Sequence, residues 1–205
     1  MKKLSVLLLA LCLCLSGCTG GTDVVDDETE TTVAPTAIQY ILDEQSVINA
    51  LEKAMEVYAV FNLCSMELDT SKAVTANGMT YCKVVSNEYS SYADLRTMVY
   101  SLFSVEIGDA LLCEDSDRPP YIDYNGELYG LDFARGSDIT KGEYTVEVEN
   151  VSNTEIICHV SVETIDFDEN ADIDSYRKVT GYEDYTFRYE YMNNKWIFTE
   201  FPYFY

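Results

Sequence analysis

Basic residues and histidine are scarce in this chain of 205 residues, which has 13 Lys and Arg, one His, and 36 Asp and Glu. The formal charge of −23 excludes nucleic acid as a partner, because so acidic a surface repels phosphate backbones. The same charge favours a basic protein or a cation as a partner. The sequence also lacks a hydrophobic run long enough to span a membrane, a Gly-rich phosphate loop and a nucleophile elbow.

The single histidine is poorly placed for catalysis. Residues 155–163 alternate like a strand, so Cys158 shares one face with its apolar neighbours and His159 points to the opposite face. Cys158 and His159 therefore cannot form a catalytic dyad. We expect His159 to be a surface residue and the protein not to be an enzyme.

A cation site deserves consideration in the acidic segment that follows this strand. Four oxygen-bearing side chains occupy alternate positions, as the first ligands of a calcium loop do, but Ala171 replaces the turn glycine and Arg177 replaces the closing carboxylate. These four are Asp166, Asp168, Asn170 and Asp172. The pattern favours a solvated acidic loop over a metal site, and we expect no metal or cofactor.

The first residues have the features of an export signal. Lys2 and Lys3 precede an apolar run over residues 4–15 that is too short to span a membrane. The sequence Leu15-Ser16-Gly17-Cys18 resembles the cleavage motif of bacterial lipoproteins, which implies an acylated Cys18. We expect a signal peptide at 1–17, an acidic, Thr-rich flexible tether at 18–36 and a single α+β domain at 37–205, lipid-anchored at the extracytoplasmic face of the cell membrane.

Four cysteines remain in the expected domain, at positions 64, 82, 113 and 158. An exported location permits disulfides, but the spacings fit no zinc pattern and the neighbours are apolar or strand-forming. Disulfides and buried free thiols among Cys64, Cys82, Cys113 and Cys158 both remain open.

Hydrophobic spacing predicts two helices in the first half of the domain. Apolar residues recur every three or four positions over residues 47–61, with Ser46 as the N-cap, and again over 92–103, with Ser90 or Ser91 as the cap. A strand is expected at 79–85, after the turn Asn77-Gly78.

Three hairpins are predicted in the second half. The first turns at Asn125-Gly126, a pair that suits the positive φ angles of a type I′ turn. The second joins strands at 144–149 and 155–163, and the third joins 185–192 to 195–201 through Asn193-Asn194. We therefore expect an α+β fold with N-terminal helices packed on a curved antiparallel sheet of hairpins. Trp196 and Phe198 should face the 47–61 helix.

The order of several short motifs resembles the bacterial DL-endopeptidase inhibitor family. The motifs are Asn77-Gly78-Met79-Thr80-Tyr81, the 91–103 helix, Asn125-Gly126-Glu127-Leu128-Tyr129, Arg135-Gly136 and Asn194-Lys195-Trp196-Ile197-Phe198. The resemblance covers residues 46–205 and implies a cystatin-like domain that blocks Cys/His peptidoglycan endopeptidases. The present chain departs from that family in its lipid anchor and its four domain cysteines.

A ligand-binding alternative follows from the same motifs. The Asn-Gly turn before Leu-Tyr and the closing Lys-Trp strand also occur in nuclear-transport-factor-2-like lipoproteins, which implies a small ligand held between helix and sheet. A pocket lined by His159 and carboxylates would favour this alternative. A filled sheet face with projecting acidic loops would favour the inhibitor.

The candidate partner-binding residues lie mainly in an acidic segment, residues 165–175. Five like charges repel one another and are costly to bury unpaired, so the segment should project. The family resemblance implies that the acidic segment enters the cleft of a basic peptidase as a wedge. The equal alternative is that the segment only keeps the protein soluble. Tyr124 is a further interface candidate among 17 tyrosines, unless it forms a cross-strand aromatic pair. The five acids are Asp166, Asp168, Glu169, Asp172 and Asp174.

The anchor prediction is tested by Cys18→Ala. Because the cysteine thiol carries the acyl chains, the variant should leave the detergent-soluble membrane fraction. A processed variant that still partitions with the membrane would contradict the lipoprotein assignment.

Overall fold

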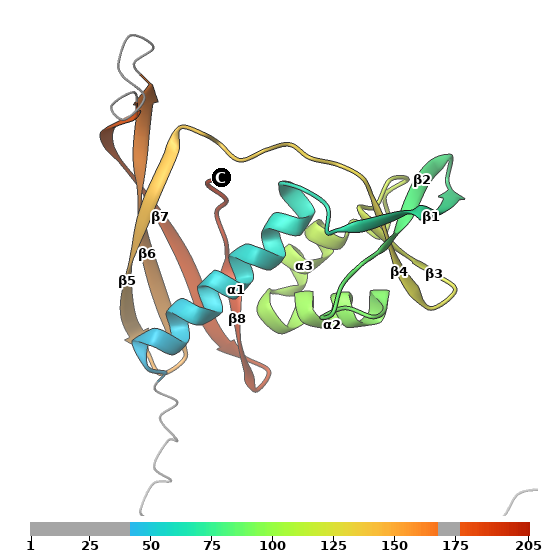
Figure 1. The fold of residues 1–205 in the computed structure, drawn as a ribbon. Coiled ribbons are helices and arrows are strands. Elements are labelled where there is room, and N and C mark those ends of the chain that lie inside the picture. The colour runs from blue at the N-terminus through green and yellow to red at the C-terminus, as the bar shows by residue number, and fades with distance from the viewer. Residues whose placement is uncertain (1–41, 168–176) are drawn as a thin grey trace, which may run out of the picture. The chain divides into compact units, whose positions relative to one another are not determined.

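Residues 42–167 and 177–205 are described by the computed structural model, and they form three α-helices and two four-stranded antiparallel sheets (Figure 1). The expected mixed α+β class is confirmed. The helices lie between the two sheets in Figure 1. Within the described ranges, no helix is long and apolar enough to cross a membrane.

The first helix, α1 (Glu44–Asn62), begins earlier than the sequence predicted. Asp43 is the N-cap, and its carboxylate accepts hydrogen bonds from the Ser46 backbone N–H at 2.9 Å and from the Ser46 hydroxyl at 2.6 Å. The prediction of Ser46 as cap is wrong because its hydroxyl is a donor to the true cap. The predicted apolar face is buried at Val47, Leu51, Ala54, Val57 and Phe61.

The second helix, α2 (Tyr92–Leu102), confirms one of the two predicted caps. Ser91 and Asp94 form a capping box, in which each side chain accepts a hydrogen bond from the other's backbone N–H. A third helix, α3 (Val105–Leu112), was not predicted; Ser104 caps it, and Cys113 ends it in the left-handed conformation with φ 48°.

The first sheet has the strand order β1-β2-β4-β3. Both of its hairpins turn at Asn-Gly pairs, with φ 49° and 75° at Asn77 and Gly78 and φ 56° and 82° at Asn125 and Gly126. These values confirm the predicted turns. The strands are β1 (Leu68–Ala76), β2 (Met79–Val84), β3 (Tyr121–Tyr124) and β4 (Glu127–Leu131).

The second sheet has its strands in sequence order, β5-β6-β7-β8. The last hairpin turns at Asn193 and Asn194, which have φ 52° and 64°. Strands β5, β6 and β7 are longer than predicted, whereas β8 ends one residue earlier, and only a two-residue turn separates β5 from β6. The strands are β5 (Lys141–Ser152), β6 (Glu155–Phe167), β7 (Arg177–Met192) and β8 (Lys195–Glu200).

The expectation of a single sheet is wrong, because the described strands form two sheets. The strand predicted at 79–85 is confirmed as β2, which lies between α1 and α2 in the sequence. The outer edge of β8 is occupied by the α2–α3 junction, where the Ser104 N–H donates to the Phe198 carbonyl at 2.8 Å. This contact blocks the edge at which the sheets could have joined.

The inner face of the second sheet is filled by apolar side chains. Phe187 and Phe198 are fully buried, and the ring of Phe201 lies 4.8 Å from Phe187 and 5.2 Å from Phe198. Tyr58 of α1 stacks on the same Phe201 at 5.2 Å. The core therefore joins α1, the second sheet and the segment after β8.

Trp196 and Phe198 share a face of β8, as predicted, but differ in their surroundings. Phe198 packs near Phe103 at the end of α2, and α2 rather than α1 is the helix packed most closely on β8. Trp196 is only partly buried, against Tyr189 at 5.4 Å and Tyr191 at 5.7 Å.

We predict that Phe198→Ala lowers the free energy of unfolding by about 3 to 5 kcal/mol, the usual cost of deleting a buried large aromatic. Trp196→Ala should cost less, because part of the indole already contacts water. Denaturant titration of both variants measures the difference. An equal or larger loss for Trp196→Ala would contradict this assignment of the core.

Candidate functional site

The ends of β6 and β7 form a narrow arm, here called the β6–β7 ribbon, comprising residues 165–167 and 177–179. Strand β5 begins at Lys141, opposite Thr164, and β8 pairs only with β7 from Arg188 onward. Beyond Thr164, β6 therefore pairs with β7 alone, apart from one hydrogen bond from the Ile165 N–H to the Thr140 carbonyl at 2.7 Å. The ribbon is the least flanked part of the second sheet (Figure 1).

Asp166 is the one acid of the predicted partner-binding segment that the structure places. It is exposed on the ribbon opposite Lys178, and its carboxylate accepts a hydrogen bond from the Phe167 N–H at 2.8 Å. The other four predicted acids of the segment lie outside the described residues, as does the expected lipid site Cys18. These four are Asp168, Glu169, Asp172 and Asp174.

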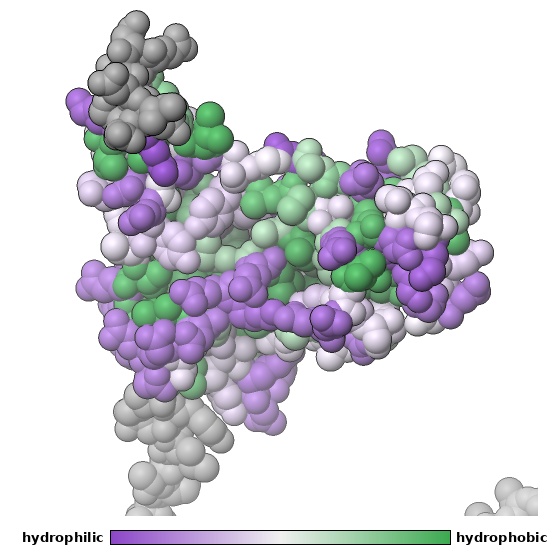
Figure 2. All heavy atoms as spheres, viewed as in Figure 1, coloured by the Kyte–Doolittle hydropathy of each residue, from purple (hydrophilic) through white to green (hydrophobic). Residues whose placement is uncertain are grey.

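Exposed apolar side chains flank the ribbon, which the sequence analysis did not single out. Val179 pairs with Ile165 and is 42% exposed, and Tyr182 pairs with Glu163 and is 66% exposed. Ile139, which is 69% exposed, immediately precedes Thr140, whose carbonyl accepts the hydrogen bond from the Ile165 N–H. Figure 2 shows hydrophobic residues at this end of the second sheet. Large apolar groups beside acidic ones suit contact with another protein.

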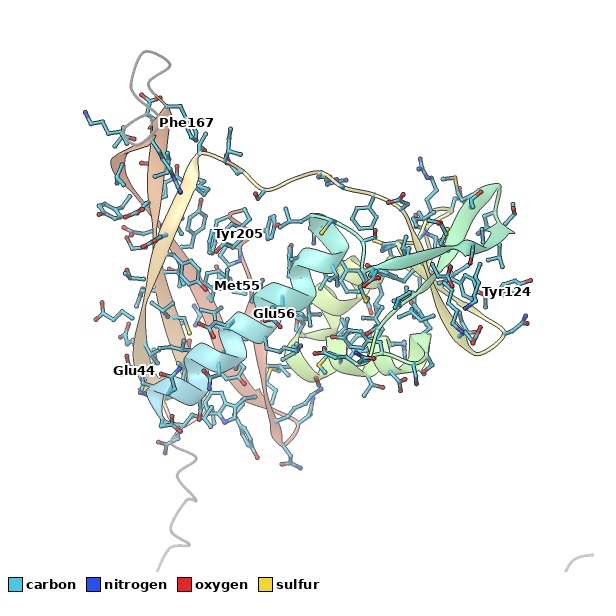
Figure 3. All side chains as sticks on the ribbon, viewed as in Figure 1. Glu44, Met55, Glu56, Tyr124, Phe167 and Tyr205 are labelled. Atoms are coloured by element: carbon cyan, nitrogen blue, oxygen red, sulfur yellow. The ribbon has the colours of Figure 1, made fainter. Side chains whose placement is uncertain are left out.

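Tyr124 does not belong to the same surface. It lies in the β3–β4 hairpin of the first sheet, where its ring meets Tyr129 edge-on at 5.4 Å. Figure 3 shows Tyr124 and Phe167 far apart, on different sheets. The structure thus gives Tyr124 the cross-strand aromatic role and does not bring it near Asp166.

His159 and Cys158 lie on opposite faces of β6, as predicted. The imidazole is exposed, with Nε2 2.9 Å from Oε2 of Glu149 on the neighbouring strand. Cys158 is fully buried on the inner face, and burial raises the pKa of its thiol to about 11. Such a thiol stays neutral and unreactive at neutral pH.

The four domain cysteines are free thiols. Cys82 and Cys158 are buried, whereas Cys64 and Cys113 are exposed. Across the described ranges, no three His, Cys, Asp or Glu residues are grouped so that they could hold a metal ion.

A groove runs along α3, beside the end of α1. Its larger hollow, of about 480 Å³, is bordered by Arg118 and Arg135, and a second hollow of about 270 Å³ is bordered by Glu106. The two hollows share Asn62, Ala110 and Leu111, so they adjoin beside α3 and are here together called the α3 groove. The other residues of the larger hollow are Phe61, Cys113, Pro120, Leu131 and Phe133.

We predict that iodoacetamide labels Cys64 and Cys113 in the folded protein, and that Cys82 and Cys158 react only after unfolding. Cys158 should stay unlabelled, because it is buried and its pKa lies near 11. Peptide mapping by mass spectrometry measures each site, and rapid native labelling of Cys158 would contradict its burial.

No model of a known protein family matches the chain, and a search of curated proteins found no match. The ribbon and the α3 groove must therefore be interpreted from their own chemistry.

Proposed function

We propose that the protein is a lipid-anchored, extracytoplasmic and non-catalytic inhibitor or regulator of a cell-wall DL-endopeptidase. The lipoprotein motif ending at Cys18 supports the location, and the short motifs along residues 46–205 support the inhibitor class. The β6–β7 ribbon is the proposed contact surface. Its acidic connecting segment and its exposed apolar flanks would meet the peptidase.

The observation that carries this proposal is the geometry of the ribbon. Two paired strands lie only about 5 Å apart, so a two-stranded arm is narrow enough to enter a cleft that a whole sheet cannot. Asp166 and Val179 on the ribbon and Tyr182 beside it offer both charge and apolar area. Protein interfaces commonly combine an apolar centre with a polar rim.

The filled inner face of the second sheet supports the inhibitor over the small-ligand module. Val162 and Phe187 are fully buried there, beneath α1 and the aromatic residues after β8. A ligand cone between helix and sheet would need this volume. His159 lies on the opposite, outer face, where a hollow of about 350 Å³ is lined by His159, Glu147 and Asp184. This hollow has the lining expected of the small-ligand alternative, but it is bordered by β5, β6 and β7 alone and is not a cone between helix and sheet.

The net charge of −23 gives the proposed inhibitor a kinetic advantage toward a basic target. Long-range attraction raises the rate of encounter, and salt screens it over a Debye length of about 8 Å at physiological ionic strength. Charges at the contact surface should therefore affect the association rate more than the fold.

The proposal is tested by neutralising the acidic segment. We predict that the purified chain slows cell-wall hydrolysis by a Cys/His endopeptidase, and that replacing five acids with Asn or Gln slows association several-fold at low salt. The difference should shrink as salt is added. The five are Asp166, Asp168, Glu169, Asp172 and Asp174.

A matched control variant replaces five exposed acids elsewhere on the domain with Asn or Gln, so its net charge equals that of the test variant. It should retain most of the association rate, because those acids are distant from the ribbon. The control positions are Glu52, Glu67, Asp115, Asp117 and Asp132. Equal rates for the two variants would remove the segment from the mechanism, and failure of the unmodified chain to slow hydrolysis would reject inhibition.

A further inference from the structure

Arg118 and Arg135 have no acidic partner among the described residues of this strongly acidic protein. The same holds for Arg177, Lys178 and Lys195, but these lie in the second sheet. Between residues 42 and 167, every other Lys or Arg lies within 4.0 Å of a carboxylate, whereas Arg118 and Arg135 form no ion pair there. The paired residues are Lys53, Lys72, Lys83, Arg96 and Lys141. Both unpaired arginines border the larger hollow of the α3 groove.

The backbone on each side holds the two arginines in place. The carbonyl of Pro119, next to Arg118, accepts a hydrogen bond from the buried Tyr81 hydroxyl at 3.1 Å. The Arg135 N–H donates to the Leu63 carbonyl at 2.6 Å, just after the end of α1. Both arginines thus lie on anchored segments that border the larger hollow. Guanidinium groups bind a carboxylate through paired hydrogen bonds.

The opposite end of the groove carries a negative charge. Glu106, Ala110 and Cys113 follow one another at i, i+4 and i+7, so they lie along one side of α3. A rise of 1.5 Å per residue separates Glu106 from Cys113 by about 10 Å. The described residues supply no ion-pair partner for Glu106. Ala110 and Leu111 provide an apolar floor between the two charged ends.

We infer that the α3 groove binds the carboxyl-terminal end of a short peptide. Its terminal carboxylate would lie at Arg118 and Arg135, its last side chain against Phe61 and Phe133, and its amino end toward Glu106. The rise of about 10 Å along α3 from Glu106 to Cys113 corresponds to about three extended residues, at about 3.4 Å each. This site is separate from the ribbon and does not rest on the proposed inhibition.

Isothermal titration calorimetry of the purified chain tests the site with the tripeptide Ala-Ala-Leu. The free tripeptide should bind, and its C-terminal amide should bind about tenfold or more weakly, because a charge-assisted hydrogen bond is lost. An N-acetylated tripeptide should bind more weakly than the free form through loss of attraction to Glu106. Octanoate and inorganic phosphate serve as probes that present an anion without a peptide.

Variants locate the binding to the groove. Arg118→Gln and Arg135→Gln should each weaken tripeptide binding about tenfold, whereas Lys72→Gln, which removes an equal charge from an exposed residue of the first sheet, should not change it. Arg135→Lys keeps the charge but not the planar donor pair, so it should bind with intermediate strength.

Three results would overturn the inference: no binding of Ala-Ala-Leu, equal binding of the acid and the amide, or arginine variants that bind like Lys72→Gln. Tighter binding of octanoate or phosphate than of the tripeptide would also reject a peptide ligand. Because no hydrolase is present, failure here leaves the proposed inhibition untouched.

Discussion

The hydroxyl of Tyr121 holds the first sheet to α1, and the position of that sheet beside the helices depends on this contact. It donates to the Val60 carbonyl at 2.8 Å and accepts from the Met66 N–H at 2.9 Å, so it satisfies backbone groups on both sides of the helix end. Its ring lies over Gly130, where a Cβ atom would approach it to 2.8 Å. Burial raises the pKa of this hydroxyl, which therefore stays protonated and able to donate.

The same joint shapes one wall of the α3 groove. After α1, the Ser65 N–H donates to the Phe133 carbonyl at 3.0 Å, and Cys64 forms a bridge with Ala134. These contacts bring the segment after β4 alongside the end of α1 and so position Arg135. The groove is therefore a product of how the first sheet is attached, whereas the β6–β7 ribbon depends only on the lengths of strands in the second sheet.

Local features of the fold could be predicted from the sequence, but its assembly could not. The turn at Asn125 follows from local conformational preference, whereas the choice of Asp43 over Ser46 as cap depends on a competition between adjacent polar residues. Strand β1 is largely exposed and polar, and α3 is short, so neither has a clear periodicity. Arg118 and Arg135 were missed because lacking a partner is a property of the three-dimensional structure.

The position of α1 has a consequence for the order of folding. Its apolar face meets Tyr144 and Val146 of β5 through the shared core, and Tyr58 stacks on Phe201 at 5.2 Å and on Tyr203 at 5.0 Å. These partners are synthesised long after the helix itself. Contacts so distant along the chain close slowly, so α1 cannot complete its core packing until the final aromatic residues of the chain have been made.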